Sequence, residues 1–374
     1  MKLLISLLSV LILLPLTALA DDFELTRTYR STRALGMGSA YSAVVMGGDS
    51  LYYNPSALAY NEGINIEIAN VNFGVNGLDV YEDIQGLPAN PTLSDYDSLF
   101  GTNIWLGSNG RATITLPYFG FGLAQDAVIK FYARDPGLPT VETYFKNDTI
   151  TSIAFASTLG PESTVGLNFK RIHRVGGYTS QLDPLTLGDV DAVSNIQSNF
   201  ANAGVGYGID LAFSHKVKAP FNPTVALVWE DVGSTAFTKS AGTDAPPLIR
   251  DNITLGLGAS VDLPGIDWLI ALDYTHANQN GIDLGKKIHI GQELSLPFID
   301  LRAGYSQGYL SYGAGFNFFL FRFDTAFYTE ELGVYPGQNP DNRIQIGLTL
   351  DLSFDANFKL TDNNGRKRKL KQRR

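Results

Sequence analysis

The clearest signal in the chain is a strict alternation of apolar and polar positions. Over residues 343–354 every even-numbered position is apolar and every odd-numbered position is polar or glycine, and residues 252–263 show the same alternation with opposite parity. A period of two indicates a β-strand with one face in an apolar medium and the other in a polar one. The alternation alone leaves open whether the apolar face packs inward, as in a soluble barrel, or faces lipid, as in a membrane barrel.

Twelve further stretches of similar length have a strand pattern, which brings the total to about fourteen. Most of them exceed the ~9–11 residues that a tilted strand needs to cross a bilayer. We therefore predict an all-β fold, a transmembrane antiparallel up-and-down β-barrel of about 14 strands over residues 63–354. The twelve stretches are 63–75, 112–123, 126–134, 149–159, 163–175, 205–217, 222–232, 266–277, 286–297, 299–306, 309–319 and 320–330.

The lengths of the connections favour the membrane barrel. Long and short segments alternate along the chain, and only the turn at Gln307-Gly308 breaks the order. Outer-membrane barrels have long loops outside and short turns on the periplasmic side, with both termini in the periplasm, whereas a soluble sandwich has no reason to alternate so regularly. The short connections are expected near Ala124, Gly160, Lys218, Pro264, Phe298 and Phe319.

Residues 21–62, which precede the first strand, follow neither a strand pattern nor an amphipathic helix pattern. Gly36 and Gly38 permit positive φ and close backbone contact, while Pro55 fixes its own φ. A barrel of about fourteen strands has a lumen wider than side chains can fill, because interiors are just filled at about eight strands. We therefore predict that residues 21–62 form a hatch inside the lumen.

The order of residues in this segment resembles the N-terminal hatch of FadL-type outer-membrane proteins, which include long-chain fatty-acid transporters and the related PorV-like barrels. The family's Asn-Pro-Ala motif matches here at Asn54 and Pro55 and departs at Ser56, where alanine is usual, so that a hydroxyl is added. The resemblance implies a fourteen-stranded barrel and a hatch that gates it. The hatch-motif residues are Arg33, Gly36, Gly38, Asn54, Pro55 and Ser56.

The two ends of the chain have their own composition. Residues 1–20 have the layout of a secretory signal peptide, with one basic residue, an apolar run and a small-residue ending before Asp21. Residues 355–374 form a basic tail that we expect in the periplasm. The chain carries −9 overall, and without Lys2 and the +7 of residues 359–374 the body sums to −17, which argues against a nucleic-acid surface. The absence of cysteine excludes disulfides and a lipid-anchor cysteine.

Two of the long connections carry apolar residues at helical spacing, residues 185–202 and, over a shorter stretch, residues 78–84. In the transporters that the chain resembles, outer loops form an apolar collecting groove. Val190, Val193 and Phe200 are therefore candidate first contacts for a ligand. A helix that merely packs on the barrel rim is the alternative.

If the apolar positions of each strand face lipid, the alternate positions face the lumen and include many charged side chains. A paired interior that grips the hatch accounts for most of them, since unpaired charges in a confined site are costly. One of Arg302, Arg322 and Arg343 is a candidate contact for a ligand carboxylate, because guanidinium binds that group bidentately, and the sequence does not select which. The predicted lumen set is Glu67, Lys170, Asp210, Asp262, Asp273, His289, Glu293, Arg302, Arg322, Asp324, Arg343 and Asp351.

Catalysis and metal binding find little support in the sequence. The four histidines are widely separated, and neither a His-Glu-x-x-His nor a Gly-x-Ser-x-Gly motif occurs. A scattered Ser-His-Asp constellation stays open. We expect no enzyme activity, no cofactor and no metal.

Three functions remain. The first is a hatch-gated channel in the cell outer membrane for uptake or export of hydrophobic small molecules such as long-chain fatty acids. The alternative is a PorV-like barrel that anchors or shuttles secreted proteins, and the third is a soluble β-rich periplasmic protein. The expected partners are outer-membrane lipid, a hydrophobic ligand, the outer-membrane assembly machinery and a periplasmic or secreted protein, but no nucleic acid.

Overall fold

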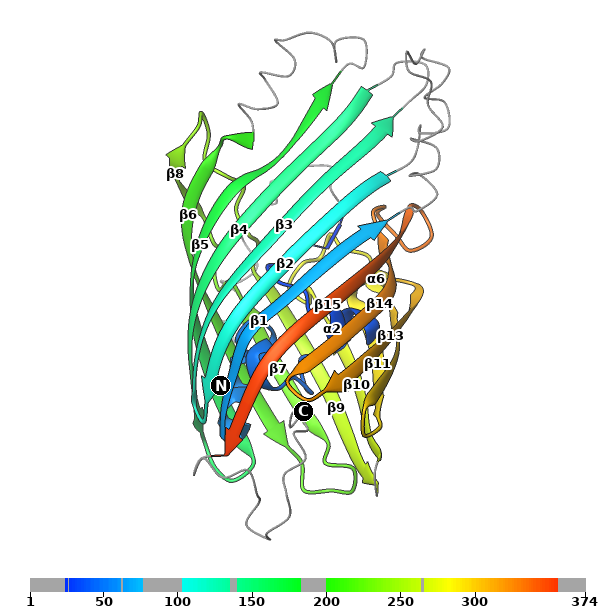
Figure 1. Cartoon of the computed structure of the whole chain (residues 1–374). Helices are drawn as coiled ribbons and strands as arrows, with labels where there is room; N and C mark the ends of the chain where they lie inside the picture. The colour runs from blue at the N-terminus through cyan, green and yellow to red at the C-terminus, as the bar shows by residue number, and fades with distance from the viewer. Residues whose placement is uncertain are drawn as a thin grey trace, which may run out of the picture.

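The computed structural model describes residues 24–25, 27–61, 63–76, 103–134, 140–182, 200–263 and 266–355. Over these residues the chain forms one closed antiparallel β-barrel with short helices inside it (Figure 1). The strands are β1 (Gly63–Asn76), β2 (Asn103–Leu116), β3 (Phe119–Arg134), β4 (Thr140–Thr158), β5 (Ser163–Leu182), β6 (Ala203–Lys216), β7 (Thr224–Glu230), β8 (Phe237–Ala241), β9 (Asn252–Leu263), β10 (Ile266–Tyr274), β11 (Ile288–Ser295), β12 (Ile299–Ser306), β13 (Tyr309–Phe318), β14 (Phe321–Glu331) and β15 (Pro340–Asp355).

Fourteen of these fifteen strands make the wall. Each pairs with its neighbours along the chain, and β1 closes the barrel against β15 in a ladder that runs from Gly63↔Asp355 to Asn76↔Arg343. The exception is β8, because β6 pairs with β7 through residues 211–216 and with β8 through residues 203–206. β8 thus continues the line of β7 after a break, and the predicted fourteen-stranded up-and-down barrel is confirmed.

The outer face of the wall is apolar and the inner face is polar. On β15, Ile346 and Leu348 are 53% and 41% exposed, whereas Gln345 and Thr349 are 3% and 1% exposed. A soluble barrel would bury the apolar parity and expose the polar one. The observed orientation is that of a membrane barrel.

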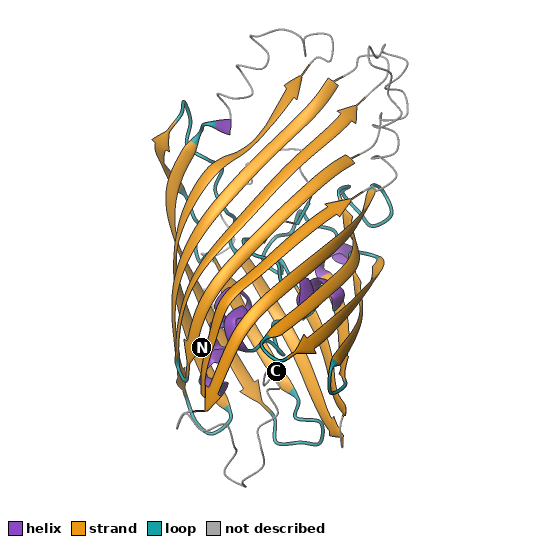
Figure 2. Cartoon of the chain, in the orientation of Figure 1, coloured by secondary structure: helices purple, strands orange, loops and turns teal. Residues whose placement is uncertain are grey.

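The hatch lies inside the barrel, in the half that ends in the short turns (Figure 2). Its elements are α2 (Thr32–Gly36), η1 (Gly47–Asp49), α3 (Ser50–Tyr53) and η2 (Pro55–Tyr60). Helices this short are unstable alone, so the hatch depends on contacts with the wall. In the described part of the chain, no helix is both long enough and apolar enough to cross a membrane.

One region of the strand prediction is wrong. The predicted strand 112–123 joins the end of β2 to the start of β3, whereas the structure turns at Pro117 and Tyr118, with Tyr118 at φ 66°. The predicted connection at Ala124 therefore lies within β3. A two-residue turn does not interrupt an apolar run, and Pro117 was the signal for it. Residues 103–111, which precede the predicted strand, belong to β2.

The wall is much taller on one side than on the other (Figure 1). β4 and β5 contain 19 and 20 residues, and both extend beyond their predicted limits of 149 and 175. On the opposite side β11 and β12 contain only 8 residues each. A four-residue helix, α6 (Leu284–Lys287), precedes β11 where the predicted strand had begun at residue 286.

Candidate functional site

Arg33 of α2 fastens the hatch to the wall. Its Nε and Nη2 donate to Glu293 Oε2 and Oε1 at 2.7 and 2.9 Å, and its Nη1 donates to Tyr41 Oη at 3.0 Å. Glu293 is on β11, and its side chain is fully buried. A bidentate pair of this kind fixes both the position and the angle of the guanidinium.

Glu293 is also the first member of a row of charges along the inner wall. Arg302 on β12 donates from Nε to Glu293 Oε2 at 2.7 Å and from Nη1 to Asp324 Oδ1 at 2.7 Å. Arg322 on β14 then donates from Nε to Asp324 Oδ2 at 2.6 Å. We call Arg33 and these four residues the charge ladder. Two of the three arginines proposed as ligand contacts, Arg302 and Arg322, are therefore engaged within the wall.

Asp49 makes a second fastening on the opposite side of the hatch. It pairs with Arg111 on β2, which also donates from Nη2 to Glu67 Oε2 on β1 at 2.9 Å. Tyr41 Oη donates to Asp49 Oδ2 at 3.0 Å, so the two fastenings share Tyr41. Burial alone would raise the pKa of Asp49, but the guanidinium of Arg111 outweighs burial and holds that pKa below its usual range.

The Asn54-Pro55-Ser56 motif anchors the C-terminal end of the hatch. Asn54 Nδ2 donates to Ser42 O at 2.8 Å within the hatch and to Ser214 Oγ on β6 at 2.9 Å. Asn54 Oδ1 accepts from Ser56 N at 3.1 Å, and Ser56 Oγ lies 2.7 Å from Ser214 Oγ. The hydroxyl by which this chain departs from the family motif therefore contacts the wall.

Glycines allow the hatch backbone to lie directly on the strands. Gly38 has φ +61°, a conformation that side chains disfavour, and a Cβ there would lie 2.6 Å from the backbone nitrogen of Tyr305. On the facing strand, a Cβ at Gly304 would overlap the backbone of Gly38. Both positions accept only glycine while the hatch is docked.

Asp273 on β10 holds the hatch backbone just after this glycine contact. Its Oδ2 accepts hydrogen bonds from the amides of Tyr41 and Ser42, both at 2.9 Å, and its Oδ1 accepts from Ser42 Oγ at 2.7 Å. The alternation predicted that Asp273 lies in the lumen but did not identify its hydrogen-bond partners. Together with the packing of α2 and η2, these contacts join the hatch to β1–β6 and to β10–β15.

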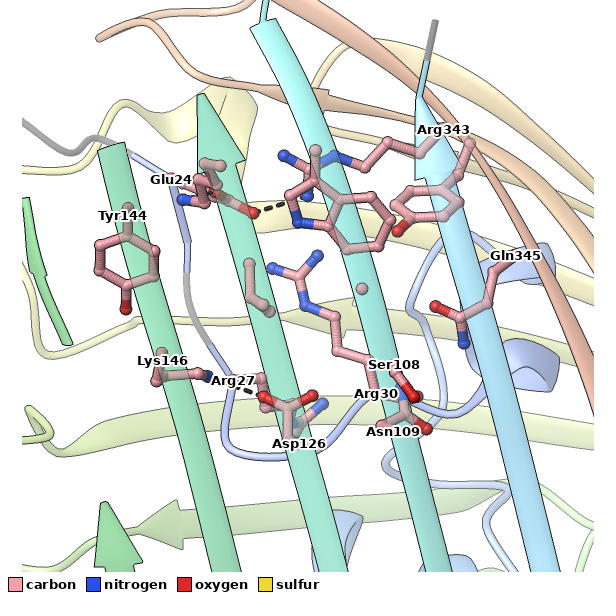
Figure 3. A pocket seen from close by; sticks show the side chains of 15 residues that line it. Glu24, Arg27, Arg30, Ser108, Asn109, Asp126, Tyr144, Lys146, Arg343 and Gln345 are labelled. Carbon is pink, nitrogen blue, oxygen red and sulfur yellow. Dashed lines mark hydrogen bonds and ion pairs between the residues drawn. The ribbon is translucent and has the colours of Figure 1, made fainter. Parts of the chain in front are cut away.

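Residues 24–25 and 27–30, here called the strap, are the first described part of the hatch, and Figure 3 shows Glu24, Arg27 and Arg30 beside the inner faces of the wall strands. Arg27 Nε donates to Glu230 Oε1 at 3.0 Å and Arg30 Nη1 to Glu330 Oε2 at 2.6 Å. Glu24 sits between Lys130 and Arg343, and accepts from Arg343 Nη1 at 2.7 Å. Burial would raise the pKa of Glu24, but the two cations, Arg343 foremost, hold that pKa well below its usual range.

A cavity of about 40 Å³ lies between the strap and the inner faces of β2–β4, β14 and β15. It holds a few water molecules at most. Arg343 alone of the three candidate arginines borders it, and Arg343 Nη2 is buried there with no hydrogen-bond partner in the described structure. The indole of Trp105 lies under the same guanidinium at 4.3 Å. The cavity lining combines five cationic side chains with the rings of Trp105, Tyr144 and Tyr328.

Of the three predicted ligand contacts in the loop, the structure describes only Phe200. Val190 and Val193 lie outside the described residues. Phe200 is described, and its ring centroid lies 5.4 Å from that of Phe145 on β4. This contact places Phe200 against the wall, and a role in ligand capture stays a prediction.

The structure brings ten of the twelve predicted lumen residues to buried inner positions. Asp351 is half-buried, and the side chain of Asp262 lies outside the description. The sequence analysis did not predict the ion pairs of the strap residues Glu24, Arg27 and Arg30. It also did not predict that Arg111 and Ser214 of the wall contact the hatch. Charged residues in an otherwise small, polar segment were the available signal for the strap, but nothing in the sequence specifies their partners.

Neither of the two Ser–His contacts among the described residues forms a Ser-His-Asp triad. Ser163 Oγ lies 2.9 Å from His215 Nδ1, and no carboxylate is hydrogen-bonded to that ring in the described structure. Ser306 Oγ lies 2.9 Å from His289 Nδ1, but the Nε2 of that ring faces the hydroxyl of Thr275 at 3.0 Å, where a triad requires a carboxylate. Gly38 O also contacts His289 Nδ1 at 3.0 Å, so the ring belongs to the hatch contact. The described residues contain no group of three or more metal-ligating side chains.

A closed barrel of fourteen strands with an N-terminal helical hatch in its lumen is the architecture of the FadL-type outer-membrane barrels. Among solved structures, the toluene transporter TodX of Pseudomonas putida matches with a TM-score of 0.51 at 13% identity, over 89% of this chain and 99% of that one. The monoaromatic-hydrocarbon channel CymD matches with a TM-score of 0.52 at 12% identity, over 87% of this chain and 97% of that one. At such identities the similarity establishes the fold. No protein-family model matches the sequence, and no curated protein matches it.

Proposed function

We propose that this protein is an outer-membrane channel for hydrophobic small molecules and that its N-terminal hatch is the gate. The observation that carries the proposal is that the lumen is filled by a segment that contributes no strand to the wall. The hatch is fastened to opposite sides of the barrel, by Arg33 to β11 and by Asp49 to β2. Because the hatch supplies no strand, it can move and open a path through the lumen while the hydrogen bonds between the wall strands stay intact.

The fold supports transport rather than catalysis. TodX is a toluene transporter and CymD a hydrocarbon channel, and both share this architecture. The apolar outer face and polar inner face suit a protein of the outer membrane, where a closed barrel satisfies all of its backbone hydrogen bonds.

Within this function we propose a ligand with an apolar body and a carboxylate end, such as a long-chain fatty acid. Arg343 Nη2 is a buried donor without a partner, and it borders a cavity whose wall includes aromatic rings. A carboxylate would satisfy that donor, and the aromatic rings would contact the apolar body beside it. Because the cavity holds only a few waters, the strap has to move before a ligand enters.

Uptake of a fluorescent long-chain fatty acid by a deletion strain tests both levels of the proposal. Restored wild-type protein should restore uptake. Arg343→Gln in a Glu24→Gln background, which keeps the pair neutral, should reduce uptake several-fold relative to Glu24→Gln alone. Lys218→Gln, an exposed site, is the matched control.

The outcomes separate the alternatives. Unchanged uptake in the deletion strain contradicts the channel, and loss of secreted proteins from the cell surface in that strain would favour the anchoring function. If uptake requires the protein but is unchanged by Arg343→Gln, the channel stands and only the contact between Arg343 and a ligand carboxylate is contradicted.

A further inference from the structure

One charged side chain breaks the rule that the outer face of the wall is apolar. In β5, Lys170 and Ile172 point inward and are 6% and 0% exposed, so Arg171 between them points outward and is exposed. Away from the strand ends, it is the one Asp, Glu, Lys or Arg at an outward position among the described strand side chains. It has no hydrogen-bond or ion-pair partner in the described structure. A lipid-facing cation needs a physical reason, because at the middle of a bilayer it costs ~2–4 kcal/mol.

Arg171 marks a boundary on the outer surface. Its cross-strand neighbours are Thr151 on β4 and Tyr207 on β6. One row towards the short turns, the corresponding positions are Ile153, Phe169 and Ile209, all apolar and 39%, 45% and 40% exposed. One row in the other direction, the polar residues Thr149 and His173 lie on β4 and β5, and Val205 follows on β6. We call the polar set the outer band: Gln125, Thr149, Thr151, Arg171, His173 and Tyr207.

The height of Arg171 agrees with an interface between membrane and water. It follows Ser163, the first residue of β5, by eight positions. At 3.3 Å per residue and a tilt of 35–45°, this places it about 20 Å from the short-turn end, near the outer edge of an apolar belt about 25 Å tall. β5 continues for eleven more residues to Leu182, so the tall side of the wall stands above this level (Figure 1).

We propose that the outer band binds the phosphate group of a lipid in the outer leaflet. A guanidinium recognises a phosphate bidentately, the band contains no acidic residue that would repel it, and hydroxyl groups of Thr151 and Tyr207 lie on the neighbouring strands. Tyr207 is 74% exposed, as expected for an aromatic ring at headgroup level. The site lies on the outside of the barrel and does not depend on the proposed transport function.

Native mass spectrometry of the purified barrel tests the proposal. The detergent-solubilised protein is incubated with hexa-acylated lipid A that carries both phosphates, or with the same lipid after removal of its phosphates. We expect the wild type to retain the phosphorylated form at least five-fold more than the phosphate-free form. Arg171→Gln should abolish that preference, and Arg171→Lys should restore part of it.

Arg250→Gln is the matched control, because Arg250 is an exposed arginine on the connection before β9. It should bind like the wild type, and heat-modifiable gel mobility checks that each variant is folded. Equal retention by Arg171→Gln and the wild type overturns the proposal, and it is also the result expected if the outer band contacts another protein. Equal retention of the two lipids by the wild type overturns it as well.

Discussion

Arg33 and Glu293, 260 positions apart in the sequence, form a buried bidentate ion pair between the hatch and β11. The side chains are 5% and 0% exposed, so both charges are buried while the hatch is docked. Glu293 also holds Arg302, which makes the carboxylate the centre of the contact. The pair therefore links the N-terminal hatch to β11, a strand in the C-terminal part of the chain.

Glu293→Gln should loosen the hatch. The substitution removes the only carboxylate that the described structure shows paired with Arg33, and one of those paired with Arg302, and breaking a buried pair costs ~3–5 kcal/mol. Release of the hatch lets water reach both cations, so we expect open events in planar bilayers to become at least several-fold more frequent. Lys218→Gln removes an exposed ion pair and should conduct like the wild type. Identical traces for Glu293→Gln and the wild type would show that another contact holds the gate.

Ser56 and Ser214 should be energetically coupled. Their hydroxyl oxygens lie 2.7 Å apart, and each also contacts Asn54. Ser56→Ala and Ser214→Ala should each lower the free energy of local opening of the hatch by ~0.5–1.5 kcal/mol. The double substitution should cost less than the sum, because it removes both partners of one hydrogen bond. Hydrogen exchange of the hatch amides measures this, and strict additivity would contradict the coupling.

The strap should stay docked in mildly acidic solution. Its anchor Glu24 has a pKa well below the ordinary value, so its contribution is fully present above the ordinary glutamate pKa of about 4.3 and is lost as the pH falls through the lower folded-state value. Hydrogen exchange of residues 24–30 should therefore be unchanged between pH 7 and 4.5 after correction for intrinsic rates. Glu24→Gln should raise exchange throughout that range. Loss of protection in the wild type near pH 4.5 would refute the assignment.

Removal of residues 21–60 should leave a folded barrel with raised permeability. Every wall strand begins after residue 62, and the ladder from β1 to β15 closes without the hatch. The lumen charges that the deletion exposes become hydrated, since water fills the opened lumen. Pro55→Gly should act in the same direction but more weakly, because it frees the turn that begins η2. Single-channel conductance is the measurement, and a truncated barrel that inserts but conducts no more than the wild type contradicts the gating role.

The orientation in the membrane can be tested with single cysteines, because the chain has none of its own. Tyr335→Cys is in the connection between β14 and β15, at an exposed position at the end of the barrel with the long connections. Lys218→Cys is in the short turn between β6 and β7. A membrane-impermeant maleimide should label position 335 but not position 218 in intact cells, and both after lysis. The reverse pattern would invert the topology.

The alternation of apolar and polar positions by itself determined the fold class, the approximate strand number and the placement of residues such as Glu293 and Asp273 on the polar face of their strands. Period two is a local property, since each residue's face follows from its parity in the strand. The same signal failed at Pro117 and Tyr118, because a turn of two residues leaves an apolar run almost unbroken. It also failed to show that β8 continues the line of β7, which depends on pairing with β6.

The sequence also determined that residues 21–62 differ from the wall, and its small residues and glycines placed a hatch there. Only the tertiary structure decided which charges meet, because the strand residues Arg302, Arg322 and Arg343 are equivalent to any rule based on parity, and Arg33 lies outside the strands. Closure of the barrel brings β11 against α2 and β15 beside the strap, so Arg33 reaches Glu293 while Arg343 keeps one donor free in the cavity. Ion-pair partners are set by register and curvature across hundreds of residues, and no local pattern carries that information.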